Sequence, residues 1–301
     1  MPFAANPYAT LKSAAQYVRR FRNKTFVVKL GGELLADPKA RKAACEQIAL
    51  LWSFSIKVVV VHGGGGGLDE LCDRLDIPVA KVAGRRITSA EVLEAAKMVF
   101  AGSLHTDLLA ELRACGLPAV GLSGVDAGLI SAVKRPLVDV DGEATDFGLV
   151  GDIESVDPAV LQHLLDGNFV PVVAPLSGDD AGAVFNTNAD TIAAEVAAAL
   201  QAERLFFLLG VPGLLRDLAN PASLLSQATL GDLAILESDG IIGGGMRPKA
   251  AAIKKALQGG VQAAHLVSGT ASDALLVEVF TNEGSGTMIL ADEPAAAGVA
   301  P

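Results

Sequence analysis

The sequence predicts an α/β fold in which helices cover a mostly parallel β-sheet. Short runs of β-branched and aliphatic residues alternate with longer segments of helical periodicity, which is typical of βαβ units. Several of the apolar runs stop at glycines, as expected where the carboxyl ends of parallel strands open into ligand-binding loops. With 301 residues, 51% of them hydrophobic and 5% aromatic, the chain can bury a mainly aliphatic core in one large domain or two lobes.

The first predicted element is a helix ahead of the sheet. Its apolar positions recur at helical spacing and are Leu11, Ala14, Ala15, Val18 and Phe21. Thr10 is the expected N-cap. The basic, acid-free first 24 residues also fit an organellar transit peptide, but the apolar stripe and its closeness to the first strand favour a structured helix. We expect a partner subunit to cover the stripe; the alternative is that it packs on its own subunit.

Six segments are predicted to be strands of the sheet. They span residues 25–30, 57–61, 119–122, 170–174, 204–209 and 263–267. Residues 131–150 carry turn signals between short extended runs, which predicts an antiparallel hairpin insertion. The small-residue tail, residues 291–301, is predicted to be disordered.

The most informative segment is a run of valines, residues 58–61, that leads through His62 into five consecutive glycines. Backbone N–H groups without neighbouring Cβ atoms can converge on phosphate or acyl oxygens. The helix that we expect to begin at Leu68 adds the attraction of its N-terminal dipole. A flexible turn is the alternative for a glycine run on its own.

Two other glycine-rich turns favour a phosphoryl-binding site. Lys29 lies near the end of the first strand, directly before Gly31 and Gly32, and Lys249 follows the glycines of residues 243–245. The spacing matches neither the dinucleotide fingerprint nor the P-loop, because no Gly-Lys-Ser/Thr follows the valine run and no acidic residue is placed for a ribose. The sequence therefore predicts a different nucleotide-binding fold.

Charge and cysteine content exclude several other classes of function. A formal net charge of −10 argues against nucleic-acid binding through a broad basic face. No apolar run is long enough for a membrane span and no signal peptide is recognisable, so we expect a cytoplasmic protein. Cys45, Cys72 and Cys115 are expected to be reduced thiols that form neither a disulfide nor a metal site.

From about Thr10 to Leu290 the chain resembles the acetylglutamate kinases, a branch of the amino-acid kinase family. The motifs that carry the resemblance span residues 29–32, 62–65, 84–88, 121–124, 186–190, 244–249 and 280–289. Each motif is weak alone, but together and in this order they are highly specific. The resemblance implies an open αβα sandwich with two lobes, in which residues 23–178 bind the acyl amino acid and dimerise and residues 179–290 bind ATP. Residues 1–22 then form an oligomerisation helix.

The activity implied by this resemblance is transfer of the γ-phosphoryl group of ATP to the side-chain carboxylate of N-acetyl-L-glutamate. That carboxylate is already ionised at neutral pH, so the enzyme needs no general base and must instead neutralise the charge on the phosphoryl group. By resemblance, Lys29 and Lys249 flank this group, Asp190 orients both lysines, and Mg²⁺ is held mainly by the phosphates of ATP. Without the resemblance, Lys29 reads as a solvated strand end and Asp190 as a helix N-cap.

The resemblance also assigns the binding residues. Those expected to bind the acyl amino acid are Gly63, Gly64, Gly65, Arg86, Asn186 and Asn188. Those expected to bind ATP are Lys29, Gly31, Gly32, Val211, Gly213, Gly245, Met246 and Lys249. The planar fork of Arg86 suits a bidentate contact with an α-carboxylate, and the asparagine amides suit an N-acyl group because they add no charge.

Three places depart from the family pattern. Gly66 and Gly67 stand where Pro-Gln is usual, so we expect a more mobile loop. Gly210 removes an aspartate expected near the nucleotide. Ser103 and His105 replace a lysine and an asparagine beside the substrate lobe, and we expect His105 to pack or form a hydrogen bond rather than act as an acid. These changes bear on ATP affinity and on acyl-group preference.

Two alternative functions stay open. One is a kinase for another acylated amino acid, such as N-succinylglutamate or an aminoadipate derivative. The other is a catalytically weak regulatory subunit that binds arginine or a signalling protein.

The N-terminal helix also resembles that of arginine-inhibited family members, which form hexamers as trimers of dimers. We therefore expect a hexamer whose ring contact is this helix. Arginine is expected to bind between the helix and the second lobe, where the candidate residues are Tyr17, Glu283, Gly284 and Gly286.

Overall fold

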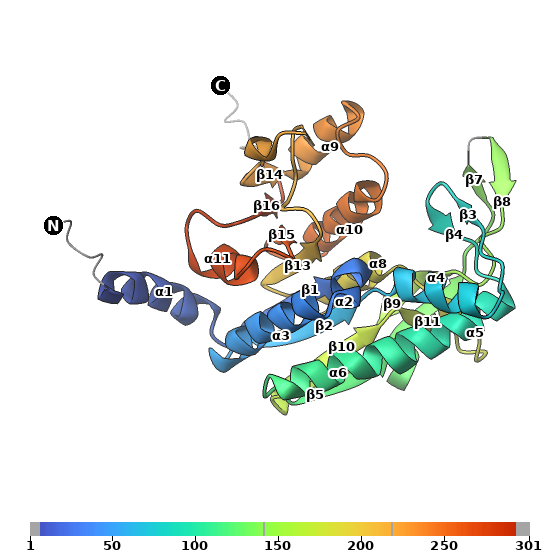
Figure 1. Cartoon of the computed structure of the whole chain (residues 1–301), viewed down its shortest axis with the longest axis horizontal. Coiled ribbons are helices and arrows are strands. Elements are labelled where there is room, and N and C mark those ends of the chain that lie inside the picture. The colour runs from blue at the N-terminus through green and yellow to red at the C-terminus, as the bar shows by residue number, and fades with distance from the viewer. Residues whose placement is uncertain (1–6, 141, 218, 293–301) are drawn as a thin grey trace, which may run out of the picture.

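An eight-stranded β-sheet forms the centre of the computed structural model, which describes residues 7–140, 142–217 and 219–292 (Figure 1). The strand order is β14-β16-β15-β13-β1-β2-β10-β5, and within the described residues every neighbouring pair is parallel except β15 and β16. The strands are β1 (Thr25–Leu30), β2 (Lys57–His62), β5 (Ala119–Ser123), β10 (Val170–Ala174), β13 (Arg204–Leu209), β14 (Gln227–Thr229), β15 (Ala264–Ser268) and β16 (Thr287–Leu290). The predicted α/β class with a mostly parallel sheet is confirmed.

All six predicted strands belong to this sheet, and their bounds differ from the prediction by at most one residue. The sequence analysis missed β14 and β16, which have only three and four residues and lie at one edge of the sheet. Such short strands carry too few apolar residues to stand out as a run.

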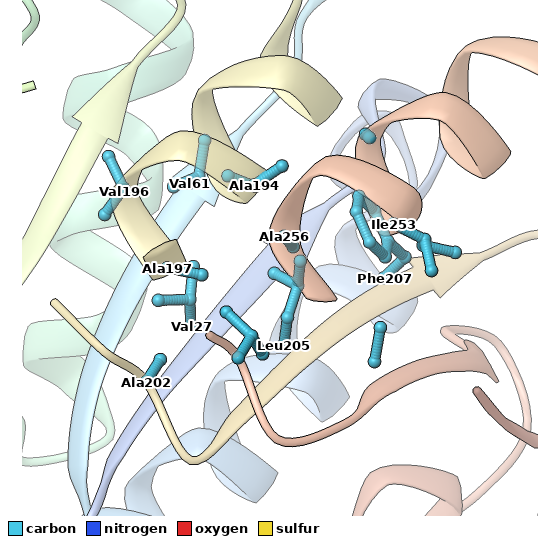
Figure 2. Close-up of a cluster of buried hydrophobic side chains, with 14 of the residues drawn as sticks. Val27, Val61, Ala194, Val196, Ala197, Ala202, Leu205, Phe207, Ile253 and Ala256 are labelled. Carbon is cyan, nitrogen blue, oxygen red and sulfur yellow. The ribbon is translucent and has the colours of Figure 1, made fainter. Parts of the chain in front are cut away.

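Helices cover both faces of the sheet because its central strands are apolar on both sides. Alternate residues of β1 point to opposite faces: Val27 packs in one buried cluster, and Phe26 and Val28 pack in another. Figure 2 shows the first cluster, in which side chains of the sheet such as Val27 and Phe207 lie beside helical side chains such as Ala197 and Ile253. The helices with side chains in the first cluster are α7 (Ala159–Asp166), α8 (Ala189–Ala199), α9 (Leu230–Ser238) and α10 (Met246–Gln258). Those in the second are α2 (Gly32–Ala36), α3 (Pro38–Ser53), α6 (Leu104–Ala114), α11 (Ala274–Phe280) and, through Phe21, the end of α1 (Pro7–Phe21).

A smaller sheet and two hairpins lie beside one end of the large sheet, at the right of Figure 1. β6 (Ile130–Lys134) pairs antiparallel with β9 (Gly151–Val156), and β7 (Val138–Val140) pairs antiparallel with β8 (Glu143–Thr145). The predicted antiparallel insertion is therefore confirmed, although Asp141 in its turn lies outside the described residues. The remaining elements here are β3 (Lys81–Val82), β4 (Arg85–Arg86), α5 (Ala90–Met98), β11 (Leu176–Gly178) and β12 (Val184–Asn186).

Helix α1 (Pro7–Phe21) extends away from the body of the molecule at the left of Figure 1. Pro7, Tyr8 and Ala9 already belong to the described part of this helix, so Thr10 lies inside it and the prediction that Thr10 caps it is wrong. At the other end, Phe21 is buried with its ring centroid 5.2 Å from that of Phe26. The last turn of the apolar stripe thus packs on its own subunit.

Helix α4 (Gly65–Arg74) begins three residues before the predicted start at Leu68. The backbone N–H of Leu68 donates to the carbonyl of Gly64 (3.0 Å), and the Leu68 side chain is fully buried. Burial of Leu68 fixes this turn, so the helix continues back through three glycines despite their low helix propensity. Gly66 and Gly67 therefore form the first turn of a helix instead of a mobile loop.

The described helices include none that is both long and apolar enough to cross a membrane. Cys45 and Cys72 are buried, Cys115 is half-buried, and all three are free thiols. Of the predicted tail, residues 293–301 lie outside the described residues.

Candidate active site

Two cavities open at the carboxyl ends of β1 and β2, and both are lined by Lys29 and Gly32. The first has a volume of about 330 Å³ and is also lined by Gly31, Glu33, Leu34, Leu208, Leu209, Gly210, Val211, Gly245, Met246 and Lys249. The second has a volume of about 230 Å³ and is also lined by Gly63, Gly64, Gly65, Arg86, Phe100, Pro175, Asn186, Thr187, Asn188, Ala189 and Asp190. Two ligands seated in these cavities would meet at Lys29.

Asp190 joins two lysines between the cavities. Lys29 Nζ lies 2.7 Å from Asp190 Oδ1, and Lys249 Nζ lies 3.2 Å from Asp190 Oδ2. The β1 alternation that buries Val27 against α8 also turns Lys29 toward that helix, where Asp190 stands in the first turn. Burial alone would raise the pKa of Asp190, but the two ammonium charges outweigh it and hold that pKa below its ordinary value. The group is therefore a carboxylate between two cations.

Asn188, and not Asp190, caps helix α8. The Asn188 Oδ1 atom accepts hydrogen bonds from the N–H groups of Asp190 (2.8 Å) and Thr191 (3.0 Å). This leaves the carboxylate of Asp190 available to the lysines. The sequence analysis gave a helix N-cap as the alternative role of Asp190, and Asn188 fills that role instead.

The glycines of the two neighbouring turns allow a close approach of backbone to backbone. A Cβ on Gly32 would lie 3.3 Å from the backbone nitrogens of Gly64 and Gly65, and a Cβ on Gly64 would lie 2.8 Å from the ring of Phe100. Gly63 N–H donates to the carbonyl of Leu30 (2.9 Å), which ties this turn to the end of β1. The N–H groups at the start of α4 therefore face the second cavity from a fixed position.

Arg86 enters the second cavity from β4 with its guanidinium held on two sides. It donates to Asp69 on α4 and, through Nη2, to the carbonyl of Gly65 (2.9 Å). Burial raises the pKa of Asp69, but Lys81 and Arg86 outweigh it and lower that pKa. Asp69 was not predicted, because its only signal is its place in the first turns of a helix.

The two asparagines present complementary groups to the second cavity. Asn186 Nδ2 donates to Thr88 Oγ1 (3.1 Å), so its Oδ1 stays available as an acceptor. Asn188 Oδ1 is occupied by the cap, so its Nδ2 stays available as a donor. One acceptor and one donor side by side are what an amide N–H and C=O require.

Most predicted site residues lie together, but Gly213 does not line either cavity. A Cβ on Gly213 would lie 2.7 Å from Thr287 Oγ1, so this glycine packs against β16. Val211 and Gly210 line the first cavity, as do Gly245 and Met246 at the start of α10. Phe100 lines the second cavity and was not predicted, because nothing in the sequence distinguishes it from an ordinary core aromatic.

His62 and His105 form a buried pair directly behind the glycine turn. His62 Nε2 lies 2.8 Å from His105 Nδ1, which is the hydrogen-bonding role predicted for His105. Burial, with the neighbouring His105, lowers the pKa of His62 to about 3, and burial also lowers the pKa of His105. A Cβ on Gly121 would lie 2.2 Å from His105 Nε2, so the imidazole occupies the space that a glycine leaves open. Both rings are neutral near pH 7.

A separate cavity of about 400 Å³ lies between α1 and the strands β13, β15 and β16. Tyr17, Glu283 and Gly284 line it as predicted residues, and Gly286 lies just outside it. Tyr17 Oη donates to Asn282 Oδ1, which joins α1 to the loop before β16. The sequence analysis missed the other ionisable groups of this cavity, which are Arg20, Arg204, His265 and Glu278.

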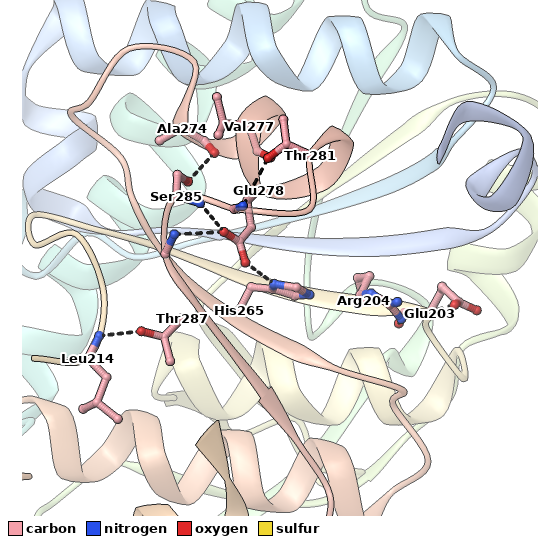
Figure 3. Close-up of polar contacts among 12 residues, drawn as sticks. Glu203, Arg204, Leu214, His265, Ala274, Val277, Glu278, Thr281, Ser285 and Thr287 are labelled. Atoms are coloured by element: carbon pink, nitrogen blue, oxygen red, sulfur yellow. Dashed lines mark hydrogen bonds and ion pairs between the residues drawn. The ribbon is translucent and has the colours of Figure 1, made fainter. Parts of the chain in front are cut away.

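Figure 3 shows Glu278 at the centre of this polar cluster. Its carboxylate accepts from His265 Nδ1 (2.7 Å) and from the N–H groups of Ser285 (2.7 Å) and Gly286 (2.9 Å). Burial raises the pKa of Glu278, but these donors outweigh it and lower that pKa; burial lowers the pKa of His265. Neutral His265 thus donates to an ionised Glu278, and its buried Nε2 has no partner among the described residues. β15 and α11 come into contact only when the chain folds, so no spacing in the sequence indicates the contact between His265 and Glu278.

Comparison with known proteins places these observations in a family. The family model described as "Amino acid kinase family" matches residues 24–268. The chain is 63% identical over 306 residues to the acetylglutamate kinase of Myxococcus xanthus (strain DK1622), covering 99% of each chain. It is 40% identical over 284 residues to that of Heliobacterium modesticaldum (strain ATCC 51547 / Ice1), covering 93% of this chain and 96% of the relative.

Solved structures agree with this placement. N-acetylglutamate synthase from Neisseria gonorrhoeae, complexed with coenzyme A and N-acetyl-glutamate, matches with a TM-score of 0.83 and 29% identity; the match covers 96% of this chain but only 64% of the synthase. Carbamate kinase from Giardia lamblia bound to AMP-PNP matches in fold, with a TM-score of 0.66 and 18% identity over 90% of this chain and 99% of the other. The two cavities joined by Lys29, Asp190 and Lys249 thus lie in a chain that belongs to the amino acid kinase family.

Proposed function

We propose that this protein transfers the γ-phosphoryl group of ATP to the side-chain carboxylate of N-acetyl-L-glutamate, a step of arginine biosynthesis. The observation that supports this most directly is the Lys29–Asp190–Lys249 cluster between two cavities of different lining. The full-length relatives named acetylglutamate kinase support the same reaction and the same acceptor.

The chemistry requires charge neutralisation more than proton transfer. The acceptor and the phosphoryl donor are both anions, and the two lysines supply positive charge where they meet. Asp190 holds both ammonium groups in place before either ligand arrives, so little reorganisation is needed in the transition state. The N–H groups at the start of α4 add donors on the acceptor side.

We assign ATP to the first cavity, with its phosphates toward Lys29 and Lys249. Among the residues that line it, Glu33 alone has a carboxylate, and the described residues hold no group of three His, Cys, Asp or Glu side chains able to hold a metal. This donor set fits Mg²⁺ bound mainly by nucleotide phosphates and water, the mode that this ion favours. The ion would add neutralising charge to the phosphates. Gly210 supplies no carboxylate of its own, but Glu33 Oε2 would lie 3.5 Å from a Cβ on Gly210, so Glu33 places a carboxylate beside this position.

We assign the acyl amino acid to the second cavity. Arg86 would bind its α-carboxylate, Asn186 Oδ1 would accept from its amide N–H, and Asn188 Nδ2 would donate to its acyl carbonyl. Its side-chain carboxylate then points toward Lys29. In this arrangement the lobe of residues 23–178 binds the acceptor with help from Asn186 and Asn188, and the lobe of residues 179–290 binds ATP.

Hydroxamate formation tests the reaction, because hydroxylamine traps an acyl phosphate. We expect turnover that requires ATP, Mg²⁺ and N-acetyl-L-glutamate. Comparable turnover of free glutamate or aspartate would contradict the assigned acceptor. Absence of turnover with every acylated amino acid would favour the regulatory-subunit alternative.

We further propose that arginine binds the cavity between α1 and the second lobe and that α1 joins dimers into a hexamer. Glu278 and His265 line this cavity and carry acceptors that suit a guanidinium group, a carboxylate and a buried Nε2 with no partner among the described residues. Glu283 also lines it. Arg204 and Arg20 supply positive charge for an α-carboxylate. Because Tyr17 on α1 also lines the cavity, a ligand there would fix the angle of the helix that joins the subunits.

A further inference from the structure

A third cavity of about 380 Å³ adjoins the acceptor cavity and is lined by positive side chains. The two cavities share Arg86, Asn186 and Asn188. Beyond these, the third cavity is lined by Arg85, Arg135 and Lys255, and no carboxylate is among its described lining residues. Four cations and no acid line one cavity in a chain of formal net charge −10. Three of them, Arg86, Arg135 and Lys255, each pair with a carboxylate that lies outside this lining. The lining itself therefore offers cationic donors and no acid, which favours an anionic ligand.

Arg135 is the most firmly positioned of these cations. Its Nε and Nη2 atoms donate to Asp152 Oδ1 (2.9 and 2.6 Å), and its guanidinium lies 5.8 Å from the centre of the Phe147 ring. Its backbone N–H donates to the carbonyl of Val150 (2.8 Å), and its side chain is only 18% exposed. Nη1 makes no hydrogen bond within the described residues. The guanidinium is thus held in one orientation, with donors left for a ligand.

The direction of the acyl chain follows from the shared asparagines. An amide that bonds Asn186 Oδ1 and Asn188 Nδ2 lies where the two cavities join. An acyl chain longer than acetyl would then continue from the acceptor cavity into the third cavity. There it would approach Arg135 of the hairpin insertion and Lys255 of α10, one from each lobe.

We propose that the third cavity is a second carboxylate subsite, which binds the far end of an acyl chain in N-acyl-L-glutamates such as N-succinyl-L-glutamate. The inference rests on the proposed function, since it assumes that the acyl amino acid occupies the acceptor cavity. It extends that function from one acceptor to a class of acceptors, those with a terminal carboxylate on the acyl group. Arg135 is the residue that determines this preference.

A comparison of three acceptors tests the subsite in the unmodified protein. They are N-acetyl-L-glutamate, N-succinyl-L-glutamate and N-succinamoyl-L-glutamate, in which an amide replaces the terminal carboxylate at nearly the same size. We expect kcat/KM for the succinyl acceptor to exceed that for the succinamoyl acceptor by about 10- to 100-fold, as a charge-assisted contact provides. Equal values for these two acceptors would overturn the proposal. Failure to phosphorylate N-acetyl-L-glutamate would instead contradict the proposed function.

Three substitutions at two adjacent residues locate the effect. R135Q should reduce the succinyl-to-succinamoyl ratio to near one, whereas R135K should keep part of it. K134Q is the matched control, because Lys134 is half-exposed, pairs with Asp146 and does not line the cavity. It should leave the ratio as it is. An unchanged ratio in R135Q, or an equal loss in K134Q, would remove Arg135 from the subsite; if R135Q does not fold, as judged by circular dichroism, R135K and the three-acceptor comparison decide.

Discussion

Lys29 is the residue on which the proposed reaction depends most, because its side chain lines both the ATP cavity and the acceptor cavity. Lys249 contacts the same carboxylate from the nucleotide side. We expect K29A and K249A each to lower kcat by about two to four orders of magnitude, the usual loss when a preorganised charge is removed from a transition state. Steady-state kinetics with saturating ATP and N-acetyl-L-glutamate measure this. A tenfold loss or less in either variant would show that its lysine does not face the transferred group.

Arg86 is expected to behave differently from the lysines. A contact with the α-carboxylate is made equally in the ground state and the transition state, so R86A should raise KM for N-acetyl-L-glutamate much more than it lowers kcat. K81A is a suitable control, because Lys81 bonds the same Asp69 (2.8 Å) but does not line the acceptor cavity. If K81A and R86A raise KM alike, the effect comes through Asp69 and not from a substrate contact.

His62 gives the protein a pH-dependent stability. Its pKa is about 3 in the folded state against 6.5 for the unperturbed side chain, so below about pH 6.5 only the unfolded state takes up this proton. The free energy of unfolding should therefore decrease as the pH is lowered, by about 1.4 kcal/mol per pH unit from this group. Urea unfolding between pH 5 and pH 7 measures the slope. H62Q should be less dependent on pH over this window, and an equal slope in both proteins would contradict a buried neutral His62.

At the scale of elements, the start of α4 determines how the glycine turn faces the acceptor. A Cβ on Gly64 would meet the Phe100 ring. A Cβ on Gly66 would have no heavy atom within 4 Å, apart from the backbone of its own helix and its chain neighbours. We expect G64A to destabilise the fold by about 1–3 kcal/mol through overpacking. G66A should stabilise it by about 0.5–1 kcal/mol, because alanine loses less backbone freedom in a helix.

Chemical denaturation of G64A and G66A distinguishes these outcomes. Hydroxamate assays on the same proteins then show whether G64A also loses turnover, as expected if the ring of Phe100 supports the turn. Equal stability of the two variants would mean that the turn is not held by Phe100.

The elements of the large sheet were predictable because each central strand is a continuous apolar run. The bounds of β1 follow from its residues alone, since Thr25 starts the run and the glycines after Leu30 stop it. The start of α4 was not predictable, because burial of Leu68 outweighs the poor propensity of three glycines. Tertiary packing decides such cases.

The site was predictable only in part. Resemblance to a family brought Lys29, Asp190 and Lys249 together, whereas spacing alone left each with an ordinary structural role. Asp69 and Glu278 were missed because their partners, Arg86 and His265, come from other elements. No local pattern encodes such contacts, since the fold alone brings these segments side by side.

At the scale of the whole molecule, α1 is attached mainly through its last turns. Phe21 is buried on β1, and Tyr17 bonds Asn282, while the start of the helix extends from the body (Figure 1). We expect deletion of residues 1–22 to lower the mass measured by light scattering from that of a hexamer to that of a dimer. Arginine should inhibit the full-length protein and not the truncated one.

Each half of this proposal has its own contrary result. Equal mass for the two proteins would show that α1 does not join dimers, and unchanged activity of the full-length protein in arginine would remove the proposed effector. The variant E278Q serves as a control for the ligand site, because it should weaken inhibition while leaving the mass unchanged.

The seam between β1 and β13 bears on how the active site can open and close. Five register pairs, from Phe26 with Arg204 to Leu30 with Leu208, join the two halves of the sheet directly beside Lys29. The two proposed lobes are therefore joined by a continuous sheet and not by a loop hinge alone. Movement of one lobe toward the other must be a twist shared among neighbouring strands, the soft deformation of a sheet. Closing the cleft would then strain the hydrogen bonds between β1 and β13. Relief of that strain would favour the open form after each turnover.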